Sequence, residues 1–281
     1  MEEERSRKIA ILIDAENISS KYAKLALDEA ARLGTVICKR IYADWSSSVS
    51  ASWRKAVMDY SIQPIQQFSN TTGKNSSDSA MIIDAMDLLH AGKLQGFCIV
   101  SSDSDFTRLA ARLRESEMMV IGMGEKKTPT SFISACDKFL YLDVLLSEKL
   151  QKEPVALTAA KPKPTKKATA AKSETVAVAA EPSDAPVKSG MDKDEITKAI
   201  AELIDENSDE DGWFFMGALG SQLLSKYPDF DARNFGFPKL TLFVKSLDTY
   251  EFRSDTNPSN PHLHLVYVRK KRENATQPAT E

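Results

Sequence analysis

Cysteine and histidine are scarce in this chain, with three of each among 281 residues. No CxxC pair occurs, and no histidine stands at ligand spacing from a cysteine. Cys38, Cys98 and Cys136 each fall in an apolar stretch, so we expect small buried thiols rather than zinc or disulfide chemistry. The histidines lie far from any candidate hydroxyl or thiol nucleophile, which argues against a Ser/His/Asp or Cys/His hydrolase.

Long apolar runs and a strong net charge are also missing. The longest apolar runs, such as residues 9–13, are far shorter than the roughly 20 residues of a membrane-spanning helix. The start, MEEERSRK, is acidic and has no apolar region behind it, so we expect no secretory signal, no membrane and a cytoplasmic location. A formal net charge of −3 excludes a protein that coats nucleic acid by charge alone. Any polyanion must therefore bind local basic clusters.

Composition divides the chain into ordered segments and a linker. Residues 151–190 are rich in Ala, Lys, Pro, Thr and Ser and contain no aromatic residue. Such a segment buries too little apolar surface to offset its ordering entropy, which predicts a flexible linker. We expect an α/β domain over residues 1–150, a small α+β module over residues 191–272 and a disordered tail over residues 273–281.

The first domain alternates strand and helix patterns, which predicts a mostly parallel sheet flanked by helices and joined by right-handed crossovers. The expected strands are 8–13, 35–42, 62–68, 96–100 and 118–122, with a last strand at 139–142. The expected helices are 20–33, 50–60, 77–89, 106–115 and 130–136.

Two of these strands end in acids, in KIAILIDAEN and FCIVSSDSDF. If the strand order is the common 3-2-1-4-5, the first and fourth strands are neighbours at the point where ligands bind such sheets. Asp14 and Asp103 follow these strands directly, and Asp105 stands two residues further on. Asp78 comes from the polar loop that leads into the third helix. The four acids predict an oxygen-rich pocket that suits Mg²⁺ or Mn²⁺ better than zinc.

Several of these polar residues also have a purely structural interpretation. Asp78 and Asp105 could cap the third and fourth helices or complement their dipoles. Asn17 could orient a water or a phosphate, or it could cap the first helix. Asp84 is rotated by about 120° from Asp78 on a helix, so we assign it a supporting role.

A cluster of acids that holds Mg²⁺ activates water and stabilises charge on a phosphate, so hydrolysis of a phosphodiester follows naturally. Basic residues that could hold the polymer are Lys74, Arg54, Lys55, Lys126 and Lys127. In the C-terminal module, Lys239 and Arg233 are the corresponding candidates for phosphate contacts.

The segments IAILIDAENIS, GKNSSDSAMIIDAMDLL, VSSDSDFTRLAARLRE and VIGMGEKKTPTSFISACDKFLYL together resemble the NYN domain family, in its bacterial LabA-like branch. The resemblance covers about residues 7–147. It implies a fold similar to that of PIN-domain nucleases and a metal-dependent ribonuclease site. By matching motif positions it assigns catalytic, metal-binding roles to Asp14, Asp78, Asp103 and Asp105, with Asn17 beside them.

The C-terminal module has helical patterns at 191–206, 217–227 and 237–247, followed by an expected hairpin of strands 250–253 and 264–268. Trp213-Phe214, the run MGALGSQLLSKYPDFDARNFGFPKLTLFVKSL and the YEFR hairpin resemble the OST-HTH domain, also called LOTUS. That resemblance implies a winged-helix-like adaptor for RNA or for a protein partner. We expect its aromatic residues to be mostly core, namely Trp213, Phe215, Phe235, Phe237 and Phe243.

The leading hypothesis is a Mg²⁺- or Mn²⁺-dependent ribonuclease whose C-terminal module recruits RNA, or a protein partner, through a flexible tether. A second hypothesis is a non-catalytic RNA-binding regulator that uses the same fold. A phosphatase with Asp14 as nucleophile and Glu16 as the second acid is disfavoured, because Ile18 occupies the position where a hydroxyl is needed. The oligomeric state is not specified by these patterns.

Overall fold

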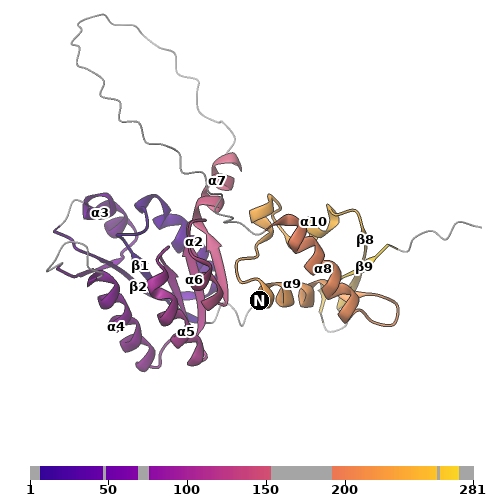
Figure 1. The fold of residues 1–281 in the computed structure, drawn as a ribbon, viewed down its shortest axis with the longest axis horizontal. Coiled ribbons are helices and arrows are strands. Elements are labelled where there is room, and N and C mark those ends of the chain that lie inside the picture. The colour runs from indigo at the N-terminus through magenta and orange to yellow at the C-terminus, as the bar shows by residue number, and fades with distance from the viewer. Residues whose placement is uncertain (1–6, 47–48, 69–75, 153–191, 258–259, 272–281) are drawn as a thin grey trace, which may run out of the picture.

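The computed structural model describes residues 7–46, 49–68, 76–152, 192–257 and 260–271, which form an N-terminal α/β domain and a C-terminal α+β domain (Figure 1). The predicted linker, but for its first two residues, and the predicted C-terminal tail lie outside the described residues. In the described parts of the chain, no helix combines the length and the apolarity needed to cross a membrane.

The N-terminal domain is built on a six-stranded parallel sheet in the order β3-β2-β1-β4-β5-β6. The predicted order of the first five strands is therefore confirmed, and the last strand extends the sheet beyond β5. The strands are β1 (Lys8–Asp14), β2 (Thr35–Ala43), β3 (Gln63–Gln66), β4 (Gly96–Val100), β5 (Met119–Gly124) and β6 (Lys138–Tyr141).

Helices cover both faces of this sheet, because its central strands are apolar on both sides. In β1, Ile9, Ile11 and Ile13 pack with α2, α3 and α7, whereas Ala10 and Leu12 pack with α4, α5 and α6. The helices are α2 (Ala23–Leu33), α3 (Val49–Asp59), α4 (Ser76–His90), α5 (Thr107–Glu115), α6 (Thr130–Ala135) and α7 (Leu142–Lys152), with short 3-10 turns at Ser20–Tyr22 and Ser104–Phe106. The sequence patterns did not predict α7.

Two of the three cysteines confirm the expectation of small buried thiols. Cys98 and Cys136 are buried, Cys38 is half-buried, and all three are free. Burial raises the pKa of Cys98 to about 12 and that of Cys136 to about 12, so these thiols stay protonated near neutral pH.

The C-terminal domain packs helices against a three-stranded antiparallel sheet in the order β7-β9-β8. The predicted closing hairpin is confirmed, while the predicted helix at 237–247 is shorter and begins at Leu240. Pro238 disfavours helical geometry in the residue before it, and Gly236 adopts a left-handed φ of 81°. The elements are α8 (Lys193–Asn207), β7 (Phe214–Phe215), α9 (Met216–Lys226), a 3-10 turn (Ala232–Phe235), α10 (Leu240–Lys245), β8 (Tyr250–Asn257) and β9 (Asn260–Lys270).

Two of the aromatic residues expected in this core lie elsewhere. Phe243 is fully buried, but Phe215 is 38% exposed, because alternate residues of β7 face opposite sides of the sheet. Trp213 is half-buried, with the guanidinium groups of Arg253 and Arg269 at 4.9 and 4.4 Å from its ring. The expectation of a core position was therefore wrong for Phe215 and Trp213.

The two domains contact each other at the β6 edge of the sheet. Strand β6 has only one neighbour, and the backbone N–H of Phe139 donates to the carbonyl oxygen of Pro228 in the C-terminal domain at 2.7 Å. The hydroxyl of Tyr141 donates to Asp229 at 2.7 Å, two residues further along the same strand. The C-terminal domain thus satisfies a donor that an edge strand otherwise leaves to solvent.

Candidate active site

Asp14 ends β1 at the carboxyl edge of the sheet, where it is 1% exposed. Its Oδ1 accepts the backbone N–H groups of Glu16 and Asn17 at 3.1 and 3.2 Å. Its Oδ2 accepts the Ser101 hydroxyl at 2.7 Å and the Asn17 side-chain amide at 2.8 Å. Burial raises the pKa of Asp14, and these hydrogen bonds act in the opposite direction. The carboxylate is therefore held in one orientation.

The pairing of β1 with β4 explains why Ser101 meets Asp14. Ile13 lies opposite Val100 in this parallel ladder, so the residues that follow the two strands emerge side by side. The Ser101 hydroxyl also accepts the backbone N–H of Asp103 at 3.0 Å. One serine thus ties the ends of both strands together. The SSDSDF motif contains this serine, but the sequence analysis considered only its acids.

Asp103 and Asp105 lie in the turn after β4. The Asp103 carboxylate accepts the backbone N–H of Asp105 at 2.9 Å and caps the 3-10 turn, whereas the N-cap of α5 is Phe106 and not Asp105. The Asn17 amide lies 3.5 Å from Asp103 and 2.8 Å from Asp14. Asn17 therefore bridges two acids instead of capping a helix, and the nearby 3-10 turn has Ser19 at its N-cap.

Asp78 lies in the first turn of α4 and is 5% exposed. Its pKa is raised to about 7, first by burial and then by the negative charges of Asp14, Asp103, Asp105 and Glu16. Carboxylates from other segments of the chain thus act on Asp78, which raises the free energy of its ionised state.

Glu16, which follows Asp14 closely in the sequence, connects these segments further. One of its carboxylate oxygens accepts the Ser77 hydroxyl at 2.9 Å, at the start of α4. The other accepts the backbone N–H of Asp44 at 3.4 Å, just beyond β2. No sequence pattern signalled these contacts, because they join residues 28 and 61 positions apart.

The donor set at this edge consists of carboxylate oxygens, which are ligands of hard divalent cations. Their mutual repulsion is what a divalent cation relieves. Among the described residues, however, no three acidic, histidine or cysteine side chains are grouped closely enough to hold a metal ion. The chemistry of the side chains fits Mg²⁺ or Mn²⁺, while the described side chains alone do not form a closed coordination shell.

Asp84 is turned away from the other acids. Its two carboxylate oxygens accept hydrogen bonds from Arg40 and Tyr42, both on β2. Burial, together with Asp84, raises the pKa of the Tyr42 hydroxyl, which remains a donor. These contacts give Asp84 a structural role in joining α4 to the sheet.

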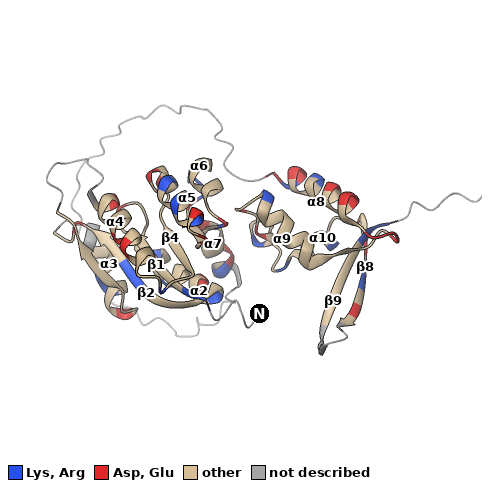
Figure 2. Ribbon diagram, turned by 90° about the horizontal axis from the view of Figure 1, so that it is seen from below, with Lys and Arg blue, Asp and Glu red and all other residues tan. Residues whose placement is uncertain are grey.

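The predicted RNA-binding residues of the N-terminal domain lie in different surroundings. Lys74 lies outside the described residues. Lys55 pairs with Asp59 on α3, and Lys127 pairs with Glu125 at 2.9 Å beyond β5. Arg54 is exposed on α3 and lines a surface cavity. Basic and acidic residues are intermixed along the helices of the described part of the chain (Figure 2). Lys126 follows β5 at the carboxyl edge of the sheet, and its backbone N–H donates to Asp143 at 3.3 Å.

The two candidates in the C-terminal domain differ in accessibility. Lys239 is exposed at the N-cap of α10. Arg233 pairs with Asp231 at 2.7 Å and with Glu29 of α2 in the other domain at 3.0 Å. The Arg233 side chain is only 19% exposed, so in this arrangement its guanidinium joins the two domains.

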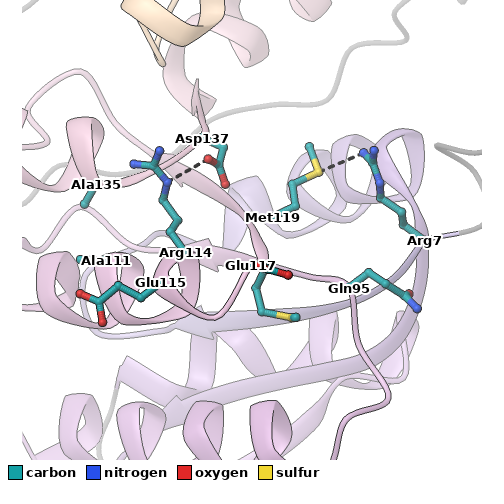
Figure 3. A pocket seen from close by; sticks show the side chains of 10 residues that line it. Arg7, Gln95, Ala111, Arg114, Glu115, Glu117, Met119, Ala135 and Asp137 are labelled. Carbon is teal, nitrogen blue, oxygen red and sulfur yellow. Dashed lines mark hydrogen bonds and ion pairs between the residues drawn. The ribbon is translucent and has the colours of Figure 1, made fainter.

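A cavity of about 780 Å³ lies at the opposite end of the strands (Figure 3). Its lining includes Arg7 before β1, Gln95 before β4 and Met119 at the start of β5. Arg114 pairs there with Asp137 at 2.8 Å. Since these residues precede the strands whereas Asp14 and Asp103 follow them, the large cavity does not belong to the acidic site.

The N-terminal domain is thus a three-layer α/β domain whose acids gather where the order of its parallel strands reverses. Residues 8–143 match the NYN domain family, which belongs to the PIN-like nuclease superfamily. Residues 191–262 match the OST-HTH/LOTUS domain family. The chain therefore combines an NYN domain with a C-terminal OST-HTH/LOTUS domain, as its sequence motifs indicated.

Among solved structures, the chain is similar to a protein of unknown function from Vibrio parahaemolyticus. The two are 19% identical with a TM-score of 0.42, over 50% of this chain and 96% of that protein. No curated protein matches the chain significantly. The two domains support a ribonuclease or RNA-associated role.

Proposed function

We propose that the protein is a metal-dependent ribonuclease that hydrolyses RNA phosphodiester bonds at the acidic edge of its NYN domain. The observation that carries this proposal is the convergence of Asp14, Asp78, Asp103 and Asp105 from three separate segments, with raised pKa values at Asp14 and Asp78. Asp14 and Asp78 are buried beside other acids, and buried acids with raised pKa values are concentrated at functional sites.

These four acids are the residues that would hold Mg²⁺ or Mn²⁺. When bound, the metal would supply an activated water and stabilise charge on the phosphate. The chain's own contribution is to orient the acids before RNA arrives. Ser101 and Asn17 fix Asp14, and Asn17 also reaches Asp103.

The C-terminal domain is proposed to recruit RNA or a protein partner to the same molecule. Lys239 is the exposed basic candidate there, and Lys126 and Arg54 remain candidates on the NYN domain. The C-terminal domain docks on the NYN domain at β6 and α2. Removal of residues 191–281 is expected to weaken RNA binding while the NYN domain remains folded.

A second candidate is a non-catalytic RNA-binding regulator. It is favoured by one observation, that the described acidic side chains are not grouped closely enough to hold a metal without further ligands. Incubation of labelled single-stranded RNA with Mg²⁺, Mn²⁺ or EDTA distinguishes the two functions.

Cleavage is expected with metal and absent with EDTA. It is expected to fall at least a hundredfold in Asp14→Asn and Asp103→Asn, because each removes a charge that holds the metal. Asp87→Asn, an exposed acid on α4, is the matched control and should retain full activity. Metal-independent cleavage, or full activity in both site variants, would refute the mechanism. RNA binding without cleavage would favour the regulator.

A further inference from the structure

A small surface cavity lies beside the acidic edge, between α3 and the outer strand β3. Its volume is about 410 Å³. The side chains that line it are mostly apolar or aromatic and include one cation, and they are Trp45, Arg54, Val57, Met58, Pro64 and Gln66. The sequence analysis singled out Arg54 only as a charge and did not anticipate a cavity beside it.

The aromatic wall of this cavity is held in place. The Trp45 indole N–H donates to the carbonyl oxygen of Ile65 at 2.9 Å, and the Trp45 backbone N–H donates to the side chain of Gln66 at 3.0 Å. Trp45 also packs against the core beneath α3. The ring is therefore positioned by the fold before any ligand binds.

Other parts of the cavity are open to solvent. Met58 is 67% exposed, and Phe68, which lies two residues beyond the end of β3 and outside the cavity lining, is 64% exposed. Large apolar side chains that are exposed together mark an interaction surface more often than a surface without a partner. No side chain in the described part of the chain pairs with the guanidinium of Arg54, whereas the adjacent Lys55 pairs with Asp59.

The cavity is linked to the acidic site by a chain of hydrogen bonds. The Gln66 side-chain amide donates to Asp44 at 3.1 Å, and the Asp44 backbone N–H donates to Glu16 at 3.4 Å. Glu16 in turn accepts the hydroxyl of Ser77, the residue before Asp78.

The sheet register sets the distance between the two places. Asp14 lies opposite Tyr42, and Tyr42 lies opposite Ile65 on β3. The backbones of Asp14 and Ile65 are thus two strand spacings of about 4.8 Å apart, or roughly 10 Å, and the cavity residues Pro64 and Gln66 flank Ile65 on β3. A nucleotide next to a phosphate held at the acids can reach across this distance.

We propose that the cavity formed by Trp45, Arg54 and Met58 is a nucleobase subsite of the NYN domain, which binds an unpaired base of single-stranded RNA flanking the phosphate at the acidic edge. An aromatic and apolar surface accepts the flat face of any base, and a free guanidinium pairs with the adjoining phosphate. An RNA base inside a duplex cannot enter, so the subsite selects single-stranded RNA. This inference rests on the proposed function, because it assumes that RNA occupies the acidic edge.

The test measures RNA binding by the full chain in EDTA, so that cleavage does not interfere. Fluorescence anisotropy compares the RNA binding of wild type with that of Arg54→Gln and Met58→Gln. The labelled single-stranded RNA has about 12 nucleotides, which covers the site sizes of OB-fold proteins that bind single strands. Both side chains are exposed, so neither substitution is expected to disturb folding. Matched controls are Lys93→Gln, an exposed cation before β4, and Leu150→Gln, an exposed leucine on α7.

We expect each cavity variant to weaken binding about five- to twentyfold, as loss of part of one base contact implies, and the controls to bind as wild type. Ultraviolet cross-linking should join the RNA to the peptides that contain Trp45 and Met58. Unchanged affinity in both cavity variants, or cross-links confined to other surfaces, would overturn the subsite and leave the surface to a protein partner. If the cavity variants weaken binding but wild type cuts no RNA with Mg²⁺ or Mn²⁺, the nuclease proposal fails and the subsite stands.

Discussion

Replacing Asp78 with Asn should stabilise the metal-free protein while it abolishes RNA cleavage. The pKa of Asp78 is raised from 3.8 to about 7 by burial and by neighbouring carboxylates. Between these two values the folded state binds a proton more tightly than the unfolded state. Stability therefore falls as pH rises from about 4 to about 7 and stays low above that range. This rise of the pKa of Asp78 corresponds to about 4 kcal/mol, which we take as an upper limit.

Asn keeps the shape of the side chain and cannot ionise. Asp78→Asn is therefore expected to be about 2 to 4 kcal/mol more stable than wild type at pH 8 and nearly equal to it at pH 4. Urea unfolding in EDTA over this pH range measures the difference. Asp87→Asn, on the exposed side of the same helix, should change neither the stability nor its pH dependence.

Adding metal should have the opposite effect on the stability difference between Asp78→Asn and wild type. Saturating Mn²⁺ should stabilise wild type by about 3 kcal/mol at a hundred times its dissociation constant, and should stabilise Asp78→Asn much less. If Asp78→Asn destabilises the metal-free protein at pH 8, or keeps the pH dependence of wild type, then the repulsion inferred among these acids is wrong.

Three further predictions concern packing and the domain contact. Asp84→Asn should lower stability by about 1 to 3 kcal/mol in urea unfolding, because its arginine and tyrosine partners lose a charged acceptor. Mn²⁺ should still stabilise the variant. Loss of the stabilisation by Mn²⁺ would contradict the structural role of Asp84. Arg233→Gln should release the C-terminal domain from the NYN domain, because the buried Glu29 loses one of its two arginine partners. Small-angle scattering should then show a larger radius of gyration. An unchanged radius would argue against the domain contact. Gly122→Ala should destabilise the NYN domain by about 1 to 3 kcal/mol in thermal unfolding, since the added Cβ would lie 2.4 Å from the ring of Phe139; a neutral result would show that β5 and β6 can separate.

Much of the site followed from the order of residues along the chain. Alternating apolar and amphipathic segments predicted the parallel sheet, and acids directly after two strands predicted an acidic edge. These features are local, or follow from the rule that carboxyl ends of parallel strands share one edge. The placement of Asp14 beside the end of β4 is the direct result of that rule.

The contacts that decide the role of each side chain came from tertiary structure. Asn17 bridges two acids, Asp103 caps the 3-10 turn before α5, and Asp84 turns towards β2. Each outcome depends on strand register and on the direction of a helix face, which a residue's neighbours in the sequence do not encode. The sequence by itself thus determined which acids reach the edge of the sheet. Only the packing of distant segments decided which acids act on the charge of Asp78, and that Arg233 joins the two domains, because these contacts depend on residues far apart in the sequence.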